Sequence, residues 1–141
     1  MKRIKFVLAE LFAIGLVLGL TLTPALSAQE HLKSGKVLER TTLKGSPEWE
    51  AILVERDLPA GAESGKHTQM GNEIVYVQSG AVVLQVQGKP DKTVRAGEAF
   101  TTSAGEVHNV KNASSSEPAK AIAFYVAKKG AKMEELSKPA K

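Results

Sequence analysis

Short runs of β-forming apolar residues alternate with turn residues along most of this chain. Residues 36–43 and 49–58 interleave β-branched and apolar positions with charged ones, as half-buried strands do, and Gly45-Ser46-Pro47 separates them. Further extended segments are predicted at residues 73–78, 81–87, 92–95, around 100, 107–110 and 121–126. The strict period of two in residues 81–87 favours a strand over a helix. Roughly eight short strands without a long helix predict a single all-β domain, a sandwich or barrel of which the jelly roll is one form.

The two ends of the chain differ from this strand-rich middle. Residues 29–35 are polar, and we predict a flexible segment there. Residues 129–141 form a polar tail rich in lysine, in which residues 133–136 make at most a frayed helical turn. Residues 111–118 are rich in Ser and Asn and are predicted to be a loop. The folded domain is therefore expected over residues 36–128.

The N-terminus carries the pattern of a secretory signal peptide. Three of its first five residues are basic, and an apolar run of 12 residues follows at positions 11–22. A helix of that length rises only about 18 Å, whereas the hydrocarbon core of a bilayer is roughly 30 Å thick. Pro24 and several small residues come next. We predict a signal peptide over residues 1–28, cleaved after Ala28 or alternatively after Ser27, and export to the periplasm or the exterior; an uncleaved membrane anchor is the other interpretation.

Charge and composition limit the partners, metal ligands and reaction classes expected for this chain. The formal charge of +4 falls to about +2 once residues 1–28 are removed, and no basic patch interleaved with aromatic residues points to nucleic acid. The chain has no cysteine, so any metal must be held by nitrogen and oxygen ligands. It also has no Gly-rich phosphate loop, nucleophile elbow or dinucleotide fingerprint, so phosphoryl and hydride transfer are not expected.

Two glycine-bounded stretches, residues 61–80 and 97–112, hold the candidate chemistry. Between them they contain four candidate ligands: His67, Gln69, Glu73 and His108. Positions 67 and 69 project from one face of a strand, and a barrel brings alternate side chains of distant strands to a common point. Each residue alone would more often be an ordinary surface or strand-edge group. Two imidazoles and a carboxylate together suit a first-row divalent metal.

The spacing of both stretches resembles the two motifs of the cupin family. The first reads G-x5-H-x-Q-x3-E-x6-G against the family pattern G-x5-H-x-H-x3-4-E-x6-G, and the second reads G-x5-S-x-G-x2-H-x3-N against G-x5-P-x-G-x2-H-x3-N. The resemblance implies a single-domain jelly-roll β-barrel, the cupin double-stranded β-helix, over residues 36–128. It implies a metal held by His67, Gln69, Glu73 and His108, with Glu73 as the candidate general base. It also implies a homodimer formed through an edge or swapped strand, for which residues 36–43 are the candidate.

Two departures from the family pattern bear on this interpretation. Ser103 stands where the family usually has proline, which loosens a turn. Gln69 stands where it usually has histidine, and an amide oxygen is a harder and weaker donor than imidazole, so copper and nickel are favoured less than with three histidines. Gln69 either binds the metal or orients water or substrate. We expect one divalent transition metal, with Fe, Mn, Ni and Zn left open.

Three functions fit these residues. The first is a small-metabolite metalloenzyme that is dioxygenase-, isomerase- or lyase-like. The second is a non-catalytic module that binds a small ligand or a metal, and the third is a barrel that has lost its metal. In the first two the partner is a small molecule. Four aromatic residues could line its pocket: Tyr76, Phe100, Phe124 and Tyr125. Gln85 and Asn109 are candidates for supporting hydrogen bonds to the ligand residues.

Overall fold

The computed structural model describes residues 35–69, 71–131 and 135–136. The predicted signal peptide and all but the last residue of the predicted flexible segment 29–35 lie outside these residues. Among the described residues, no helix has the length and apolar character needed to cross a membrane.

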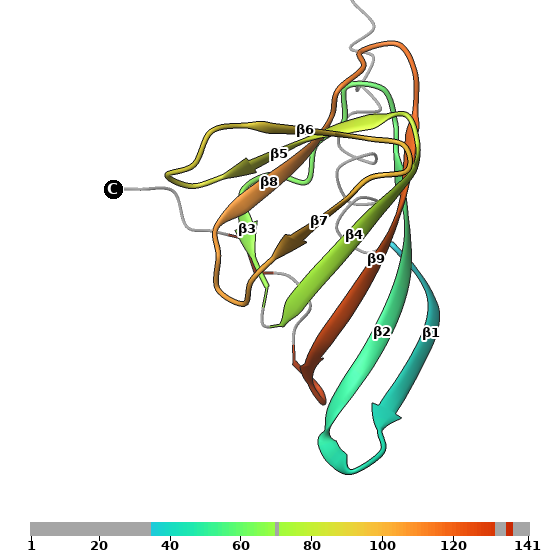
Figure 1. Cartoon of the computed structure of the whole chain (residues 1–141), viewed down its shortest axis with the longest axis vertical. Helices are drawn as coiled ribbons and strands as arrows, with labels where there is room; N and C mark the ends of the chain where they lie inside the picture. The colour runs from blue at the N-terminus through green and yellow to red at the C-terminus, as the bar shows by residue number, and fades with distance from the viewer. Residues whose placement is uncertain (1–34, 70, 132–134, 137–141) are drawn as a thin grey trace, which may run out of the picture.

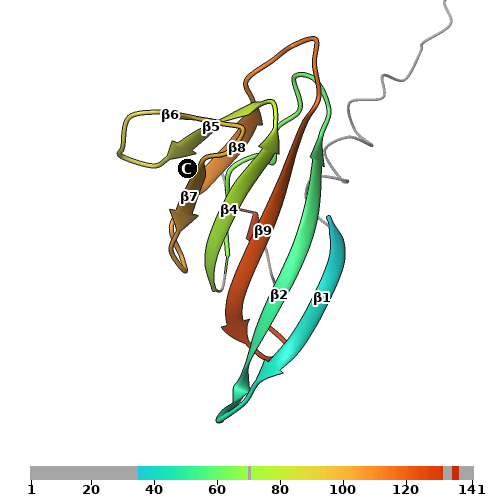
Figure 2. The same ribbon diagram turned by 45° about the vertical axis from the view of Figure 1, so that its right-hand side comes forward.

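Two antiparallel five-stranded sheets face each other (Figure 1). The first, called here the long-stranded sheet, has the order β1 (Lys36–Leu43), β2 (Ser46–Leu58), β9 (Ala119–Lys128), β4 (Asn72–Ser79), β7 (Ala99–Thr102). The second, the short-stranded sheet, has the order β10 (Glu135–Leu136), β3 (His67–Thr68), β8 (His108–Asn112), β5 (Ala81–Val86), β6 (Lys92–Arg95). In Figures 1 and 2, strands β1, β2 and β9 run on past the end of the short-stranded sheet. The all-β jelly-roll prediction is confirmed, and within the described residues no ladder joins the two sheets into a closed barrel.

The core lies between the sheets because each inner strand buries every second side chain. In β4, Glu73, Val75 and Val77 are buried while Ile74 and Tyr76 are exposed. Burying a valine or leucine side chain contributes about 1.5–3 kcal/mol, so this repeated pattern holds the sheets together. The buried core residues are Ile52, Val54, Leu58, Val75, Val77, Val82, Leu84, Val94, Phe100, Ala119, Ala121, Ala123 and Tyr125.

Most predicted strands are present, and their ends differ by a few residues. β2 begins at Ser46 rather than at Trp49, because Ser46 pairs with Leu43 across a two-residue turn whose Gly45 has a φ of 85°. Pro47 pairs with no described residue in the ladders to β1 and β9, so its missing N–H costs no bond in them. β8 extends into the predicted loop 111–118 as far as Asn112, and β9 begins at Ala119, directly after that loop.

Two further predictions about strands were wrong. β1 was expected to be half-buried, but every residue from Lys36 to Thr42 is exposed, because β1 is an edge strand whose one neighbour among the described strands is β2. Within 133–136, Glu135–Leu136 forms a strand instead of a helical turn. It pairs with the free edge of β3, a partner more than sixty positions away that no local pattern reveals.

Candidate functional site

The two candidate histidines lie side by side at the inner face of the short-stranded sheet. His67 of β3 and His108 of β8 are direct register partners, their ring centroids are 4.3 Å apart, and both side chains are buried. Sequence spacing could not show this pairing, because forty positions separate the two residues. The antiparallel ladder between β3 and β8 brings them together.

Each imidazole is held by a backbone carbonyl two residues before it. His67 Nδ1 lies 2.8 Å from the Gly65 oxygen, and His108 Nδ1 lies 2.9 Å from the Glu106 oxygen. A carbonyl only accepts, so each Nδ1 carries the proton and each Nε2 keeps its lone pair. Burial lowers the pKa of His108, against opposing contributions from Glu106 and Glu73. A neutral imidazole with Nδ1–H on a carbonyl and a free Nε2 lone pair is the form that binds metals.

Glu73 enters the site from the opposite sheet and is held by two hydrogen bonds. Gln69 Nε2 donates to Glu73 Oε2 over 3.1 Å, and Thr102 Oγ1 donates to the same oxygen over 3.0 Å. Gln69 Nε2 also donates to Thr102 Oγ1 over 2.6 Å. Thr102 was missed by the sequence analysis. Its involvement depends on its register pairing with Glu73 between β7 and β4, which motif spacing does not encode.

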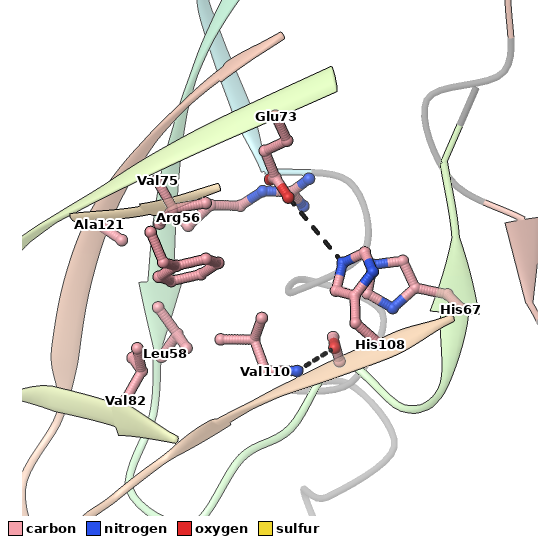
Figure 3. Close-up of a pocket in the computed structure, with 11 residues that line it drawn as sticks. Arg56, Leu58, His67, Glu73, Val75, Val82, His108, Val110 and Ala121 are labelled. Atoms are coloured by element: carbon pink, nitrogen blue, oxygen red, sulfur yellow. Dashed lines mark hydrogen bonds and ion pairs between the residues drawn. The ribbon is translucent and has the colours of Figure 1, made fainter. Parts of the chain in front are cut away.

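The four predicted ligand residues therefore converge from both sheets. His108 Nε2 lies 3.9 Å from Glu73 Oε2, as the dashed line in Figure 3 shows. As these side chains stand, the described residues contain no group of three or more His, Asp or Glu that could hold a metal ion. Gln69, the fourth predicted ligand, directs its amide nitrogen to Glu73.

Two buried atoms in this site nevertheless lack a hydrogen-bonding partner, Gln69 Oε1 and His108 Nε2. Both are lone-pair acceptors, and an unsatisfied buried polar atom costs about 1–3 kcal/mol. A bound cation or water would satisfy both, whereas no donor among the described side chains does. The donor set, two imidazoles with amide and carboxylate oxygens, thus fits a first-row divalent metal.

A small cavity adjoins these residues between the sheets (Figure 3). Its volume is about 40 Å³, and the residues that line it are Arg56, Leu58, Ser64, His67, Glu73, Val75, Val82, Phe100, His108, Val110 and Ala121. Of the predicted pocket aromatics only Phe100 lines it, while Tyr76 and Phe124 are exposed and lie outside it. Tyr125 is buried behind Arg56.

Arg56 is a cavity residue that the sequence analysis missed. It follows the buried Val54 and precedes the buried Leu58 on the inward row of β2, so period-two alternation places its side chain between the sheets. Its Nη2 donates to the Tyr125 hydroxyl over 2.6 Å, and its guanidinium carbon lies 5.9 Å from the centroid of that ring. Arg56 interrupts the apolar inward positions Ile52, Val54 and Leu58, and this charge was the signal that could have identified it.

Other residues of the two motifs shape the backbone around the site. The buried amide of Asn112 donates to the carbonyls of Leu58, Pro59 and Glu117, and so ties together two loops. Asn109 and Gln85 were predicted to support the ligands. Asn109 instead binds Ser64, Glu63 and Gln85, so neither prediction is supported by a bond to an imidazole. Four glycines of the motifs have a positive φ, as tight turns require: Gly61, Gly80, Gly97 and Gly105.

Comparison with solved structures finds the same fold in proteins of low sequence identity. A conserved protein with a double-stranded β-helix domain from Klebsiella pneumoniae is 20% identical, with 78% of this chain and 88% of that chain covered and a TM-score of 0.58. A cupin-like protein from Thermotoga maritima is 22% identical, with 72% and 73% covered and a TM-score of 0.55. A DMSP lyase from Ruegeria pomeroyi is 18% identical, with 75% and 54% covered and a TM-score of 0.53.

These likenesses establish the fold and no particular activity. The chain spans about half the length of the lyase chains it matches, at 44% and 54%. A comparison with curated proteins gives no match. The family model described as "Cupin domain" matches residues 54–125, which contain both glycine-bounded stretches and all four candidate ligands. The chain therefore belongs to the cupin family.

Proposed function

We propose that this chain is an exported cupin that binds one divalent transition metal through His67, His108, Glu73 and Gln69, and that it acts on a small molecule in the adjoining cavity. The observation that carries the proposal is the pair of buried lone pairs without donors, on Gln69 Oε1 and His108 Nε2. Burying two such acceptors together without partners is costly, and a bound cation would offset that cost by taking both lone pairs. Export rests on the N-terminal sequence pattern alone.

The residues around such a site have separate roles in orienting the ligands. The carbonyls of Gly65 and Glu106 orient the rings of the two histidines through Nδ1, and His108 Nε2 has no hydrogen-bonding partner among the described residues. Gln69 and Thr102 hold the Glu73 carboxylate in place. The metal, when bound, would supply a Lewis acid or a redox centre for the reaction. Nitrogen and oxygen ligands of this kind leave iron, manganese, nickel and zinc open.

A non-catalytic binding module is the second candidate. It is favoured by the engagement of Glu73 Oε2 with two donors, because a general base must release such partners before it takes a proton. The small cavity, about 40 Å³, also suits retention of a compact ligand. If the protein turns over small metabolites and this activity disappears when the metal is removed, the enzyme is favoured over the binding module.

Metal content tests the proposal directly. The mature protein should be purified without an affinity tag from the compartment to which it is exported, and its metal measured by elemental analysis beside His67→Ala, His108→Ala and Gln69→His. We expect near-stoichiometric metal in the natural protein and in Gln69→His, and loss of at least nine-tenths of it in each alanine variant. His31→Ala is the matched control, since it removes the one remaining histidine, which lies outside the described residues.

Two results would contradict the metal proposal. One is a folded His108→Ala protein that keeps the full metal content of the natural protein. The other is a natural protein that stays empty while Gln69→His fills, which would mean that the glutamine has removed metal binding. Circular dichroism of each variant shows whether it is folded, and the intact mass of the same samples shows whether the mature chain starts at Gln29.

A further inference from the structure

Two turns of the chain share a sequence and a pair of hydrogen bonds. Residues 95–98 read Arg-Ala-Gly-Glu, and residues 103–106, called here the site turn, read Ser-Ala-Gly-Glu. In both, the backbone nitrogen of the glutamate donates to the carbonyl of the first residue, and the backbone nitrogen of the first residue donates to the glutamate Oε2. The glycines Gly97 and Gly105 have positive φ values of 87° and 76°. The glutamate side chain thus closes each turn with a bond beyond the ordinary backbone bond of a β-turn.

The site turn contacts the candidate metal ligands. It lies between β7 and β8 (Figure 1). The Glu106 carbonyl accepts the Nδ1 proton of His108 over 2.9 Å, and the Gly105 nitrogen donates to the backbone oxygen of Gln69 over 2.9 Å. The turn 95–98 bonds instead to the backbone of Val77 on β4. A displacement of the site turn would therefore move the acceptor that orients the His108 ring.

The Glu106 carboxylate has a bond on each oxygen. Oε2 accepts from the Ser103 nitrogen over 3.2 Å, and Oε1 pairs with Lys89 Nζ from the loop between β5 and β6. Ser103 stands where the motif pattern has proline, and it supplies the N–H that a proline lacks. The Lys89 side chain is 62% exposed, so water screens the ion pair and the bond to Ser103 is the main restraint on the turn.

The protonation form of His108 depends on this turn. A neutral imidazole carries its proton on either nitrogen, and a carbonyl at Nδ1 selects the form with a lone pair on Nε2. Substitution of Glu106 leaves the carbonyl in the chain but releases the turn that positions it. We propose that Glu106 is a positioning residue for His108: its carboxylate holds the site turn through the Ser103 N–H, and the turn holds the imidazole in the form that binds metal. The effect on metal affinity rests on the proposed function, whereas the effect on the ring does not.

Nuclear magnetic resonance of the imidazole nitrogens tests this inference without a metal. The mature protein is labelled with ¹⁵N and treated with a chelator, and the tautomer of each histidine is read from its proton–nitrogen correlations. We expect His108 in the natural protein to carry its proton on Nδ1. Glu106→Ala should show a second population with the proton on Nε2. His67, whose Nδ1 lies against the Gly65 carbonyl, is the internal control and should keep its tautomer.

Zn(II) affinity, measured by competition with a chromogenic chelator, is the second readout. Loss of a group bonded to a metal ligand typically weakens affinity by 10- to 100-fold, and Glu106 acts one bond further away, so we expect a decrease of about 3- to 10-fold in Glu106→Ala. Glu98→Ala is the matched control, since it removes the same side chain from the turn 95–98. It should lower the urea midpoint about as much and change neither the tautomer nor the affinity. Glu106→Gln keeps an oxygen that accepts from the Ser103 N–H and should behave nearly as the natural protein does.

Ser103→Pro tests whether Glu106 acts through the turn. Proline fixes φ and has no N–H to donate, so in this background the carboxylate has no bond to make with residue 103. We expect Glu106→Ala in the Ser103→Pro background to leave the His108 proton on Nδ1 and to reduce Zn(II) affinity by less than about twofold. An effect of Glu106→Ala as large there as in the natural protein would show that Glu106 does not act through Ser103, and would overturn the inference.

Other results overturn the inference whatever the outcome for the metal. One is a folded Glu106→Ala protein whose His108 keeps its proton on Nδ1 as the natural protein does. Another is an equal change of tautomer in Glu98→Ala, which would place the effect in the stability of the fold. Should Glu106→Ala fold only together with Ser103→Pro, loss of the Nδ1 form in that double variant has the same meaning. A natural protein that binds no Zn(II) contradicts the metal proposal and leaves the tautomer test of Glu106 in force.

Discussion

At the scale of single residues, the candidate site depends on groups that orient the ligands as much as on the ligands themselves. Thr102 is fully buried and bonds to both Glu73 and Gln69. Supporting bonds of this kind fix a carboxylate before any metal arrives, and their loss typically lowers metal affinity by 10- to 100-fold. Gly65 and Glu106 support the imidazoles through backbone carbonyls, which no side-chain substitution removes.

Replacing Thr102 by valine tests this support. Valine has nearly the same shape, so the fold should persist while Glu73 loses one of its two donors. We expect about a tenfold weaker affinity for Zn(II), measured by competition with a chromogenic chelator. Thr101→Val, an exposed neighbour on the other face of β7, is the control and should bind as the natural protein does. Equal affinity in the two variants would show that Thr102 has only a packing role.

At the scale of elements, turns set the register that brings the ligands together. Gly80 joins β4, which carries Glu73, to β5, which pairs with the His108 strand. It has a φ of 73°, and a Cβ built there would lie 2.9 Å from the Ala119 Cβ and 3.1 Å from the Pro118 oxygen. Gly88, in the turn between β5 and β6, has a similar φ of 79° but nothing within 4 Å.

Alanine substitutions at Gly80 and Gly88 distinguish the cost of backbone strain from the cost of a steric clash. Gly88→Ala should cost only the left-handed conformation, about 1–2 kcal/mol of unfolding free energy. Gly80→Ala has the same conformational cost and in addition a steric clash with β9. We expect its unfolding free energy to fall by roughly 1–3 kcal/mol more than that of Gly88→Ala. Urea unfolding followed by circular dichroism measures both. Equal losses in the two variants would mean that β9 moves aside without penalty.

At the scale of the whole molecule, one edge of the long-stranded sheet is open within the part of the chain that the structure describes. There β1 pairs only with β2, and it exposes the large apolar residues Val37 and Leu38, at 50% and 42%. Exposed edges with apolar side chains favour pairing with another chain. A second exposed apolar group lies on the outer face of β4 and β9, formed by Ile74, Tyr76 and Phe124.

We predict a homodimer in solution that pairs through β1. The double variant Val37→Lys, Leu38→Lys should shift the protein to monomer in light scattering and in sedimentation velocity, because two buried charges in the interface are unfavourable. Ile74→Lys with Tyr76→Lys is the matched control and should remain dimeric. Only monomer in the natural protein contradicts dimerisation, and loss of the dimer in the control alone would place the interface on β4 and β9.

The family, most of the strands and the four candidate ligands were readable from the sequence, because period-two alternation and motif spacing are local properties of the chain. The turns with positive φ at Gly61, Gly80, Gly97 and Gly105 could likewise be read locally, since such turns favour glycine wherever they occur. Sequence alone could also have singled out Arg56, a charge between the inward apolar positions Val54 and Leu58 of β2. It could not say what that charge faces.

Tertiary structure decided everything that depends on which strands are neighbours. Only the register of β3 with β8 places His67 beside His108, and only the pairing of β4 with β7 gives Glu73 its partner Thr102. The exposure of β1 and the pairing of Glu135–Leu136 with β3 follow from sheet edges in the same way. The physical reason is common to all of them. Backbone hydrogen bonds between strands are indifferent to sequence, so long-range partners are selected by the packing of the whole barrel rather than by any local pattern.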